Sequence, residues 1–313
     1  MTVELRLGFD LGVARLRGAL ADGSIVAELS EPTRKGSPRE VAGQLVGLAA
    51  RLQARAGIRV DGPSKVVAAG IAVPTTVDPR TGMLASAPSF PSLDGVELGA
   101  MLARAFGFPV AVENDANAGA LAEGKSGAAV GISDYVMLVI RTGVGMGIVV
   151  DGQLVRGWRG MAGEIDRMPL GGSSDSQVPG RRREHEFAIV GLPGQSRLMR
   201  PSVPGGSRLA EPRSIADAVA AAARGDAPAS RAVRDQARLV ALGIAAVVAV
   251  LDPELVILGG EIGAIPGLLE PVREEVDLLI TESPRIETSP LGDRGPLLGA
   301  LEAAESLMNR APS

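Results

Sequence analysis

The chain alternates between short apolar runs and longer segments of helical periodicity, a pattern typical of α/β proteins. Three apolar runs at the start predict strands, and Asp22-Gly23 between the second and third is a strong hairpin signal. Ser37-Pro38 then supplies the cap and first turn of a helix predicted at 37–56. The first half of the chain thus predicts strands at LRLGFD, ARLRGALAD and SIVAEL, the 37–56 helix, a strand at KVVAAGIAVP, a loop to residue 95, a helix at VELGAMLARAFG and a strand at PVAVE.

Residues 135–157 repeat the pattern of the first strands. YVMLVI predicts a strand, RTGVGMG a glycine-rich bend, and GIVVDGQLVRG a hairpin that turns at Asp151-Gly152. Two such meanders indicate duplicated domains. The later part predicts a long irregular segment at 171–213, an Ala-rich helix, a helix at 229–250, a strand at ELVILGG, a helix at 264–280, a strand at RIETSP and a closing helix.

Composition excludes several classes of function. The chain has 313 residues, enough for two domains, with no Cys, a single His and a net charge of -4. Disulfides, thiolate metal sites and a Cys nucleophile are therefore excluded. The negative charge argues against nucleic-acid or membrane-surface binding. The longest apolar run, 239–251, is too short to span a bilayer, and the polar N-terminus is no signal peptide, so we expect a soluble cytoplasmic protein.

The stretch from Gly119 to Ser126 matches the G-x-x-x-x-G-K-S pattern of a nucleotide-binding loop. Such a loop needs a strand that runs into its first glycine and a helix that opens at the Lys-Ser pair. Here the spacer ALAE is a strong helix former, and the following GAAVGIS leaves no room for the required helix. We therefore predict that Gly124 to Gly127 end a helix that begins at Ala116 and do not bind phosphate.

Glu113, Asn114 and Asp115 follow the apolar run PVAV, where a strand meets that helix. Asp115 has two interpretations. It is placed to cap the helix by accepting a backbone N–H bond. A carboxylate at a strand-to-helix junction is equally well placed as a general base, within about 2.6–3.2 Å of a substrate hydroxyl.

Glycines also recur at the bends of the two meanders. Gly143-x-Gly145-x-Gly147 resembles a dinucleotide fingerprint but runs into a strand instead of a helix, so it is not a Rossmann motif. Glycines at such a bend can still present backbone N–H groups to phosphate oxygens. GFDLG is the equivalent bend of the first meander, where Asp10 is available to a metal-bound phosphate.

Six blocks of the sequence resemble the ROK family (repressors, open reading frames, kinases) in content and order: GFDLG, AVENDANAGALAEGKSG, IRTGVGMGIVVDG, GMAGEIDRMPL, DPELVILGG and GPLLGAL. The resemblance extends over residues 6–305. It implies an α/β, two-domain actin-like (ribonuclease H-like, hexokinase-type) ATPase fold with a central cleft. We expect residues 1–112, completed by the closing helix at 297–313, to form the N-terminal domain, and 113–296 to form the C-terminal domain.

The resemblance also implies roles for particular residues. Asp115 would be the catalytic base that activates a sugar hydroxyl. The further sugar contacts would be Asn114, Glu164, Glu186 and Arg167. ATP and Mg²⁺ would be the cofactors, and the partners would be a small-molecule sugar and a second copy in a homodimer. The nucleotide would be bound by Asp10 and Gly12 in the first phosphate loop, Thr142, Gly143 and Gly145 in the second, and Gly259 and Gly260 in the adenosine loop.

Several positions depart from the family pattern. Val13-Ala14 replace the Gly-Thr of the first phosphate loop, and Arg141 replaces a Gly before Thr142. Thr75 replaces the Gly of a V-P-G-P motif, and Ser89 replaces a sugar-binding Asn. Arg167 replaces a His that binds both zinc and sugar in family members. With no Cys either, we expect no structural zinc. Arg167 has the geometry for an anionic ligand, but pairing with Asp166, Glu164 or Glu186 is the preferred interpretation.

Two functions therefore remain open. The first is an ATP-dependent, glucokinase-like sugar kinase with Asp115 as base. The second is a non-catalytic sugar sensor, the effector part of a transcriptional regulator without its DNA-binding domain. Asp115 favours the kinase, whereas Val13-Ala14 favour the sensor. The changed sugar contacts leave the identity of the sugar open.

Overall fold

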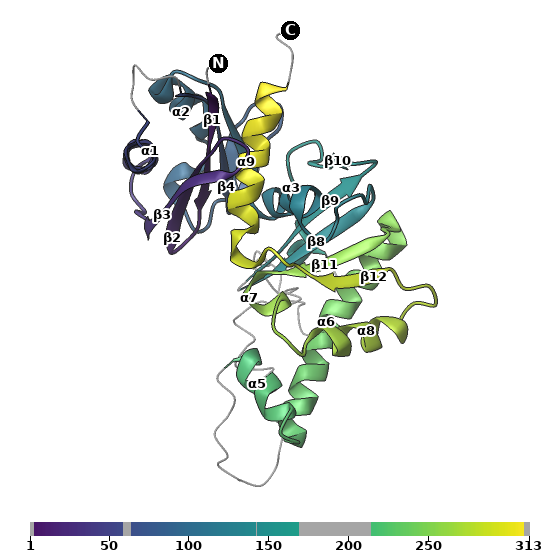
Figure 1. The fold of residues 1–313 in the computed structure, drawn as a ribbon. Helices are drawn as coiled ribbons and strands as arrows, with labels where there is room; N and C mark the ends of the chain where they lie inside the picture. The colour runs from purple at the N-terminus through teal and green to yellow at the C-terminus, as the bar shows by residue number, and fades with distance from the viewer. Residues whose placement is uncertain (1–2, 59–63, 142, 169–213, 310–313) are drawn as a thin grey trace, which may run out of the picture. The chain divides into compact units, whose positions relative to one another are not determined.

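The computed structural model describes residues 3–58, 64–141, 143–168 and 214–309, which form two compact units (Figure 1). One unit comprises Met1–Gly131, Gln153–Ala162 and Asp293–Ser313, and the other Ile132–Gly152 and Gly163–Gly292. The domain boundary expected at 112/113 thus differs from the first boundary between these units, at 131/132. The reason is that the helix after Asn114 packs along the closing helix of the chain, which belongs to the first unit.

The first unit is built on a five-stranded mixed sheet of order β3-β2-β1-β4-β7. Its β1 runs antiparallel to β2 and parallel to β4, and β4 runs parallel to β7. The ends of β4 and β7 therefore lie at the same edge of the sheet. The strands are β1 (Val3–Leu11), β2 (Arg15–Ala21), β3 (Ile25–Pro32), β4 (Ser64–Val73) and β7 (Val110–Asn114).

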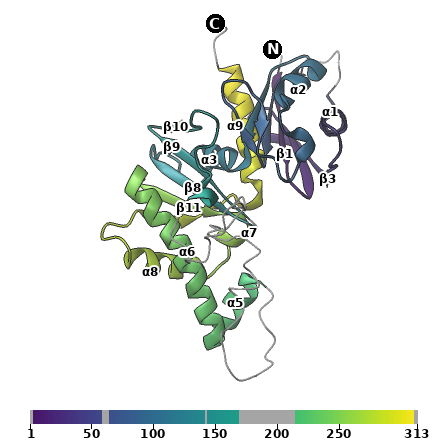
Figure 2. The same cartoon turned by 180° about the vertical axis from the view of Figure 1, so that it is seen from behind.

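The two faces of this sheet carry side chains of different size. Helices α1 (Pro38–Arg55) and α2 (Leu98–Phe106) cover one face, over a core of large residues such as Leu7, Phe9 and Leu45. Helix α9 (Gly295–Met308) covers the other face, together with α3 (Asp115–Ser126) (Figures 1 and 2). That face is made of small residues, and α9 comes so close that a side chain at Gly70 would overlap the carbonyl of Ala300.

The second unit repeats this topology in a sheet of order β10-β9-β8-β11-β12. Here β8 is antiparallel to β9 and parallel to β11, which is parallel to β12. The duplication inferred from the two meanders is thereby confirmed. The strands are β8 (Tyr135–Ile140), β9 (Val144–Val150), β10 (Gln153–Leu154), β11 (Leu255–Gly259) and β12 (Arg285–Thr288); the helices are α5 (Ile215–Ala222), α6 (Ala227–Leu251), α7 (Gly260–Gly263) and α8 (Leu269–Asp277).

Most predicted elements agree with the observed ones to within a few residues, but two segments differ. The helix predicted at 264–280 is the shorter α8, because Gly267 after Pro266 has a φ of 90° that interrupts any helix. The loop before residue 95 contains a small hairpin, β5 (Thr76–Val77) and β6 (Leu84–Ala85), and a 3₁₀ turn, η1 (Pro91–Leu93). The segment predicted to be irregular at 171–213 lies outside the described residues. Within the described part of the chain, no helix has both the length and the apolar character to cross a bilayer.

Candidate active site

Asn114 and Asp115 lie where β7 ends and α3 begins. Asn114 is the N-cap of α3, and its Oδ1 accepts hydrogen bonds from the backbone N–H groups of Ala116 (2.9 Å) and Asn117 (3.2 Å). Its Nδ2 donates to the carbonyl oxygen of Thr75 (3.2 Å), just beyond the end of β4. The capping interpretation of Asp115 is therefore wrong: the cap is Asn114, and Asp115 is the first helical residue, partly buried.

Directly before this pair, Glu113 is a buried carboxylate with three donors. It is only 4% exposed and accepts hydrogen bonds from the backbone N–H of Asn114 (3.1 Å) and Nδ2 of Asn117 (2.9 Å). Its other oxygen accepts from Nε of Arg156 at 2.7 Å. Sequence reasoning gave neither Glu113 nor Arg156 a role. The available signal was a charged residue at the end of a buried strand, which requires a partner when it is ionised.

The GKS sequence lies at the opposite end of α3. Lys125 is in the last turn of the helix, and its Nζ lies 3.3 Å from Oε2 of Glu302 and 3.6 Å from Oε1 of Glu305 on α9. The charge of Glu302 is the largest cause that raises the pKa of Lys125. A helix ends at Lys125-Ser126 where a phosphate loop needs one to begin, so the predicted helix end is confirmed. That this segment does not bind phosphate stays a prediction.

The first glycine bend connects β1 to β2. Gly12 is required sterically, since a Cβ there would lie 2.7 Å from the carbonyl oxygen of Arg15, and the Asp10 carboxylate lies beside it. The hydroxyl of Thr33 donates to the carbonyl of Gly12 (2.7 Å), and the N–H of Thr33 donates to Ala14 (3.1 Å). Val13 at the tip is 44% exposed and offers no hydroxyl.

The second glycine bend occupies the same topological position, between β8 and β9. The N–H of Arg141 donates to the carbonyl of Gly143 at 2.9 Å, and a Cβ on Gly143 would meet nothing within 4 Å. The backbone at Gly143 is thus accessible, whereas Gly145 lies within β9. Thr142 is outside the described residues.

Gly259 is the last residue of β11, the parallel neighbour of β8, and Gly260 begins α7. Gly260 has a φ of 81°, and a side chain there would lie 2.5 Å from the carbonyl oxygen of Ile140. The end of β11 is therefore pressed against the end of β8, directly before the Arg141–Gly143 bend. The structure brings these glycines together at the carboxyl edge of one sheet, the usual ligand edge of α/β proteins.

Glu164 and Arg167 lie at a 3₁₀ turn, η2 (Ile165–Arg167), beside β9. The carbonyl of the preceding Gly163 accepts the N–H of Met146, which fixes the turn to the strand. Nη2 of Arg167 lies 3.2 Å from Oε2 of Glu164, so the preferred interpretation of Arg167 as a partner of a nearby carboxylate is confirmed. Glu186, the other proposed sugar ligand, lies outside the described residues.

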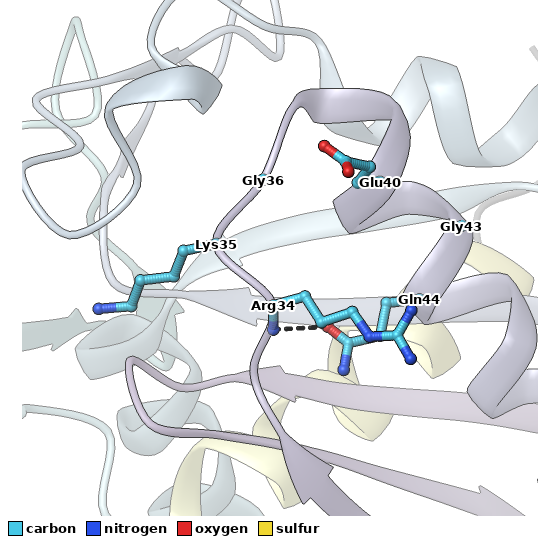
Figure 3. Close-up of a pocket in the computed structure, with 6 residues that line it drawn as sticks. All are labelled: Arg34, Lys35, Gly36, Glu40, Gly43 and Gln44. Carbon is cyan, nitrogen blue, oxygen red and sulfur yellow. Dashed lines mark hydrogen bonds between the residues drawn. The ribbon is translucent and has the colours of Figure 1, made fainter.

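A surface depression of about 430 Å³ lies at the start of α1, lined by Arg34, Lys35, Gly36, Glu40, Gly43 and Gln44 (Figure 3). Figure 3 shows the side chains of Arg34 and Lys35 extending in opposite directions. The Gln44 side-chain amide accepts a hydrogen bond from the backbone N–H of Arg34 and donates to Glu31 and to the carbonyl of Pro32. Glu40 and Ser37 form the capping box of the helix. The depression thus contains groups that stabilise α1, and none of the residues expected at the active site.

The arrangement defines the class of fold first. Two α/β units share one strand order, and each carries a glycine bend between its first two antiparallel strands, as in the actin-like ATPase fold. The sequence model of the ROK family matches residues 6–306, and the chain belongs to that family.

Individual relatives include enzymes and a repressor. The chain is 31% identical over 307 residues to the bifunctional enzyme NanE/NanK of Brucella suis, covering 95% of this chain and 53% of that protein. It is 28% identical to the xylose repressor of Caldicellulosiruptor bescii, covering 80% of this chain and 65% of that one. The chain thus spans about half the length of the bifunctional enzyme. The crystal structure of a ROK hexokinase from Thermus thermophilus superimposes with a TM-score of 0.77 at 29% identity, covering 98% of this chain and 100% of that one.

Proposed function

We propose that the protein is an ATP-dependent sugar kinase in which Asp115 is the general base. The supporting observation is the division of roles at the start of α3. Because Asn114 caps the helix, the Asp115 carboxylate is not needed for that purpose. The similarity to a ROK hexokinase over nearly the whole of both chains supports the same function.

The residues around Asp115 fit the requirements of a base. Its position in the first turn of α3 places the carboxylate where the helix dipole favours negative charge. Asn114 is held at both ends of its amide, by the helix and by Thr75, so the junction is rigid. Asn114 Nδ2 has two N–H protons, of which one is donated to Thr75, and the other would be donated to a sugar hydroxyl. The family resemblance adds Glu164 and Glu186 to the sugar contacts.

The glycine bends fit the phosphates of a nucleotide in part. The accessible backbone at Gly143 and the close-packed Gly12 provide N–H groups of the kind that bind phosphate oxygens, and Asp10 provides a carboxylate for the metal. When bound, Mg²⁺-ATP supplies the phosphoryl group that the sugar hydroxyl accepts. The residues of the chain would position that hydroxyl, accept its proton at Asp115 and offset the charge on the phosphates.

A sugar panel tests this function. We expect one hexose, amino sugar or sugar acid to raise the thermal midpoint of unfolding, and the protein to form ADP and a sugar phosphate from that sugar and Mg²⁺-ATP. Asp115→Asn should lower kcat by about 10²-fold or more, the usual contribution of a general base, while the sugar still binds. Turnover by Asp115→Asn at the wild-type rate would exclude Asp115 as the base.

The second candidate is a sugar sensor without kinase activity. The exposed Val13 and the adjacent Ala14 favour the sensor. They stand in place of a Gly, which lets the backbone approach phosphate closely, and a Thr, which provides a hydroxyl. The similarity to a xylose repressor is consistent with a sensor.

The double substitution Val13→Gly/Ala14→Thr separates the two candidates. If the natural protein binds sugar without turnover and the double variant gains ADP formation, the sensor is correct and the bend is where activity was lost. If the natural protein already forms sugar phosphate, the sensor is excluded. The readout is the amount of sugar phosphate measured by mass spectrometry, with ADP formed in equal amount.

A further inference from the structure

Arg156 is a partly exposed residue whose guanidinium is bound to a buried carboxylate. It precedes an exposed loop, 157–159, and its Nε donates to the buried Glu113 carboxylate at 2.7 Å. The side chain is 38% exposed while that of Glu113 is 5% exposed. The Arg156 guanidinium is therefore anchored through Nε to a buried carboxylate, although more than a third of the side chain is exposed.

The anchor links this guanidinium to the end of β7, directly before the proposed base. One Glu113 oxygen accepts from Arg156, and the other accepts the backbone N–H of Asn114 at 3.1 Å. Arg156 and Asn114 are thus bridged by a single carboxylate, although they are 42 positions apart in the sequence. The Asn117 amide binds the same carboxylate and limits its rotation. Every one of these groups belongs to the first unit.

Within residues 3–58, 64–141, 143–168 and 214–309, the outer nitrogens of Arg156, Nη1 and Nη2, make no hydrogen bond. Among the described residues, the structure records one interaction of this side chain, the bond from Nε to Glu113. Nη1 and Nη2 carry four N–H groups in a fixed plane. An arginine held through Nε keeps this outer edge in one orientation, so little rotamer freedom is lost when it binds a ligand.

We propose that Arg156 binds the acceptor sugar, donating from Nη1 and Nη2 to its hydroxyl oxygens, and that Glu113 is the positioning residue that orients it. The inference rests on the proposed sugar site at Asn114–Asp115. The charge of Arg156 is offset by Glu113, so the pair offers oriented donors without a net charge. That chemistry suits the neutral oxygens of a polyol better than an anionic group.

Three variants and one control test this role. Arg156→Lys keeps the positive charge that Glu113 requires but loses the planar outer edge. We expect it to unfold at nearly the wild-type temperature and to bind the sugar about tenfold more weakly, the loss of one charge-assisted hydrogen bond. Glu113→Gln should weaken the sugar to a similar extent because the guanidinium is no longer held. The double variant should be little worse than either, since both act through one contact. Arg159→Gln removes an exposed charge from the same loop and should bind as the wild type does.

The measurements are sugar titrations followed by calorimetry, and KM for sugar and for ATP where turnover is present. A rise in the sugar KM with the ATP KM unchanged supports a contact to the acceptor. A merely structural defect would weaken the binding of both sugar and ATP and would also lower the unfolding temperature. If the wild type binds sugar without turnover and Arg156→Lys weakens sugar binding, the inference that Arg156 contacts the sugar holds and the kinase proposal fails. If turnover is present and Arg156→Lys binds the sugar as tightly as Arg159→Gln does, the inference is wrong and the kinase proposal stands. If no sugar of the panel binds the wild type, both are wrong.

Discussion

Asn114 and Asp115 are adjacent in the sequence, but the place where α3 begins assigns them different tasks. Asn114 has extended backbone angles, with φ -60° and ψ 145°, and its amide binds the N–H groups of the first helical turn. Asp115 enters the helix as its first residue and is the base in the proposed function. Lys125 lies at the other end of the same helix, where its ammonium forms ion pairs with two carboxylates of α9. One twelve-residue helix thus carries the proposed base at its start and a structural ion pair at its end.

Lys125→Ala tests the assignment at the residue scale. Because Lys125 is paired with Glu302 and Glu305, its removal should leave the dissociation constant for ATP nearly unchanged. The unfolding free energy should fall by less than about 1 kcal/mol, as is usual for a half-exposed ion pair. Nucleotide titration gives the answer. A loss of ATP affinity of tenfold, ~1.4 kcal/mol, would restore the GKS sequence as a phosphate loop.

At the scale of elements, the first unit depends on close backbone approach between α9 and its neighbours. Gly299 of α9 lies against the carbonyl of Ala118 in α3, and Gly70 of β4 lies against Ala300. Ala72, Ala118 and Ala300 form a small cluster between them. Small residues on α9 and on the elements it contacts let α9 pack closely against the sheet and against α3. This packing holds α3, and therefore the Asn114–Asp115 junction, in place.

Gly299→Ala should therefore be strongly destabilising. A methyl group there would overlap the Ala118 carbonyl, which is backbone and has no rotamer to change, so we expect a loss of more than about 2 kcal/mol. Gly43→Ala is the matched control within a helix. It lies on an exposed part of α1 with no atom within 4 Å of the added carbon, and it should stabilise the protein by about 0.5–1 kcal/mol. Denaturant unfolding of both variants measures the difference. Equal effects would show that α9 does not pack against α3 in this way.

At the scale of the whole molecule, the two units share one topology, and each places a glycine bend between its first two strands. The duplication gives two glycine bends from two copies of one motif. Their sequences have diverged, since a Cβ at Gly143 of the second bend would meet no atom within 4 Å, whereas the exposed Val13 lies at the tip of the first. In the proposed kinase, we expect this divergence to affect how each bend binds phosphate.

Metal content is a property of the whole chain. With no Cys and with Arg167 in place of the family's zinc-binding His, we expect protein purified without added zinc to contain far less than one zinc per chain. Inductively coupled plasma mass spectrometry of the dialysed protein measures it. A stoichiometric zinc would mean that carboxylates and His185 form a site that the sequence pattern does not reveal.

The sequence by itself determined most of the strands and helices and the two Asp-Gly hairpins, because periodicity and turn chemistry act over a few neighbouring residues. The same local logic rejected the GKS motif, since a helix-forming spacer shows that the chain cannot bend there. It also identified Asn114-Asp115 as the junction to examine, and the order of six motifs indicated the family and the duplicated fold.

Only the tertiary structure decided which residues meet. The pairing of Glu113 with Arg156, the contact of Lys125 with α9 and the inclusion of α3 in the first unit join positions far apart in the chain. Which of two adjacent polar residues caps α3 was also undecided until the hydrogen bonds of Asn114 to Thr75 and to the helix were seen. A buried carboxylate requires a partner, but the partner's identity depends on which segments the packing of α9 and the sheet brings to the end of β7.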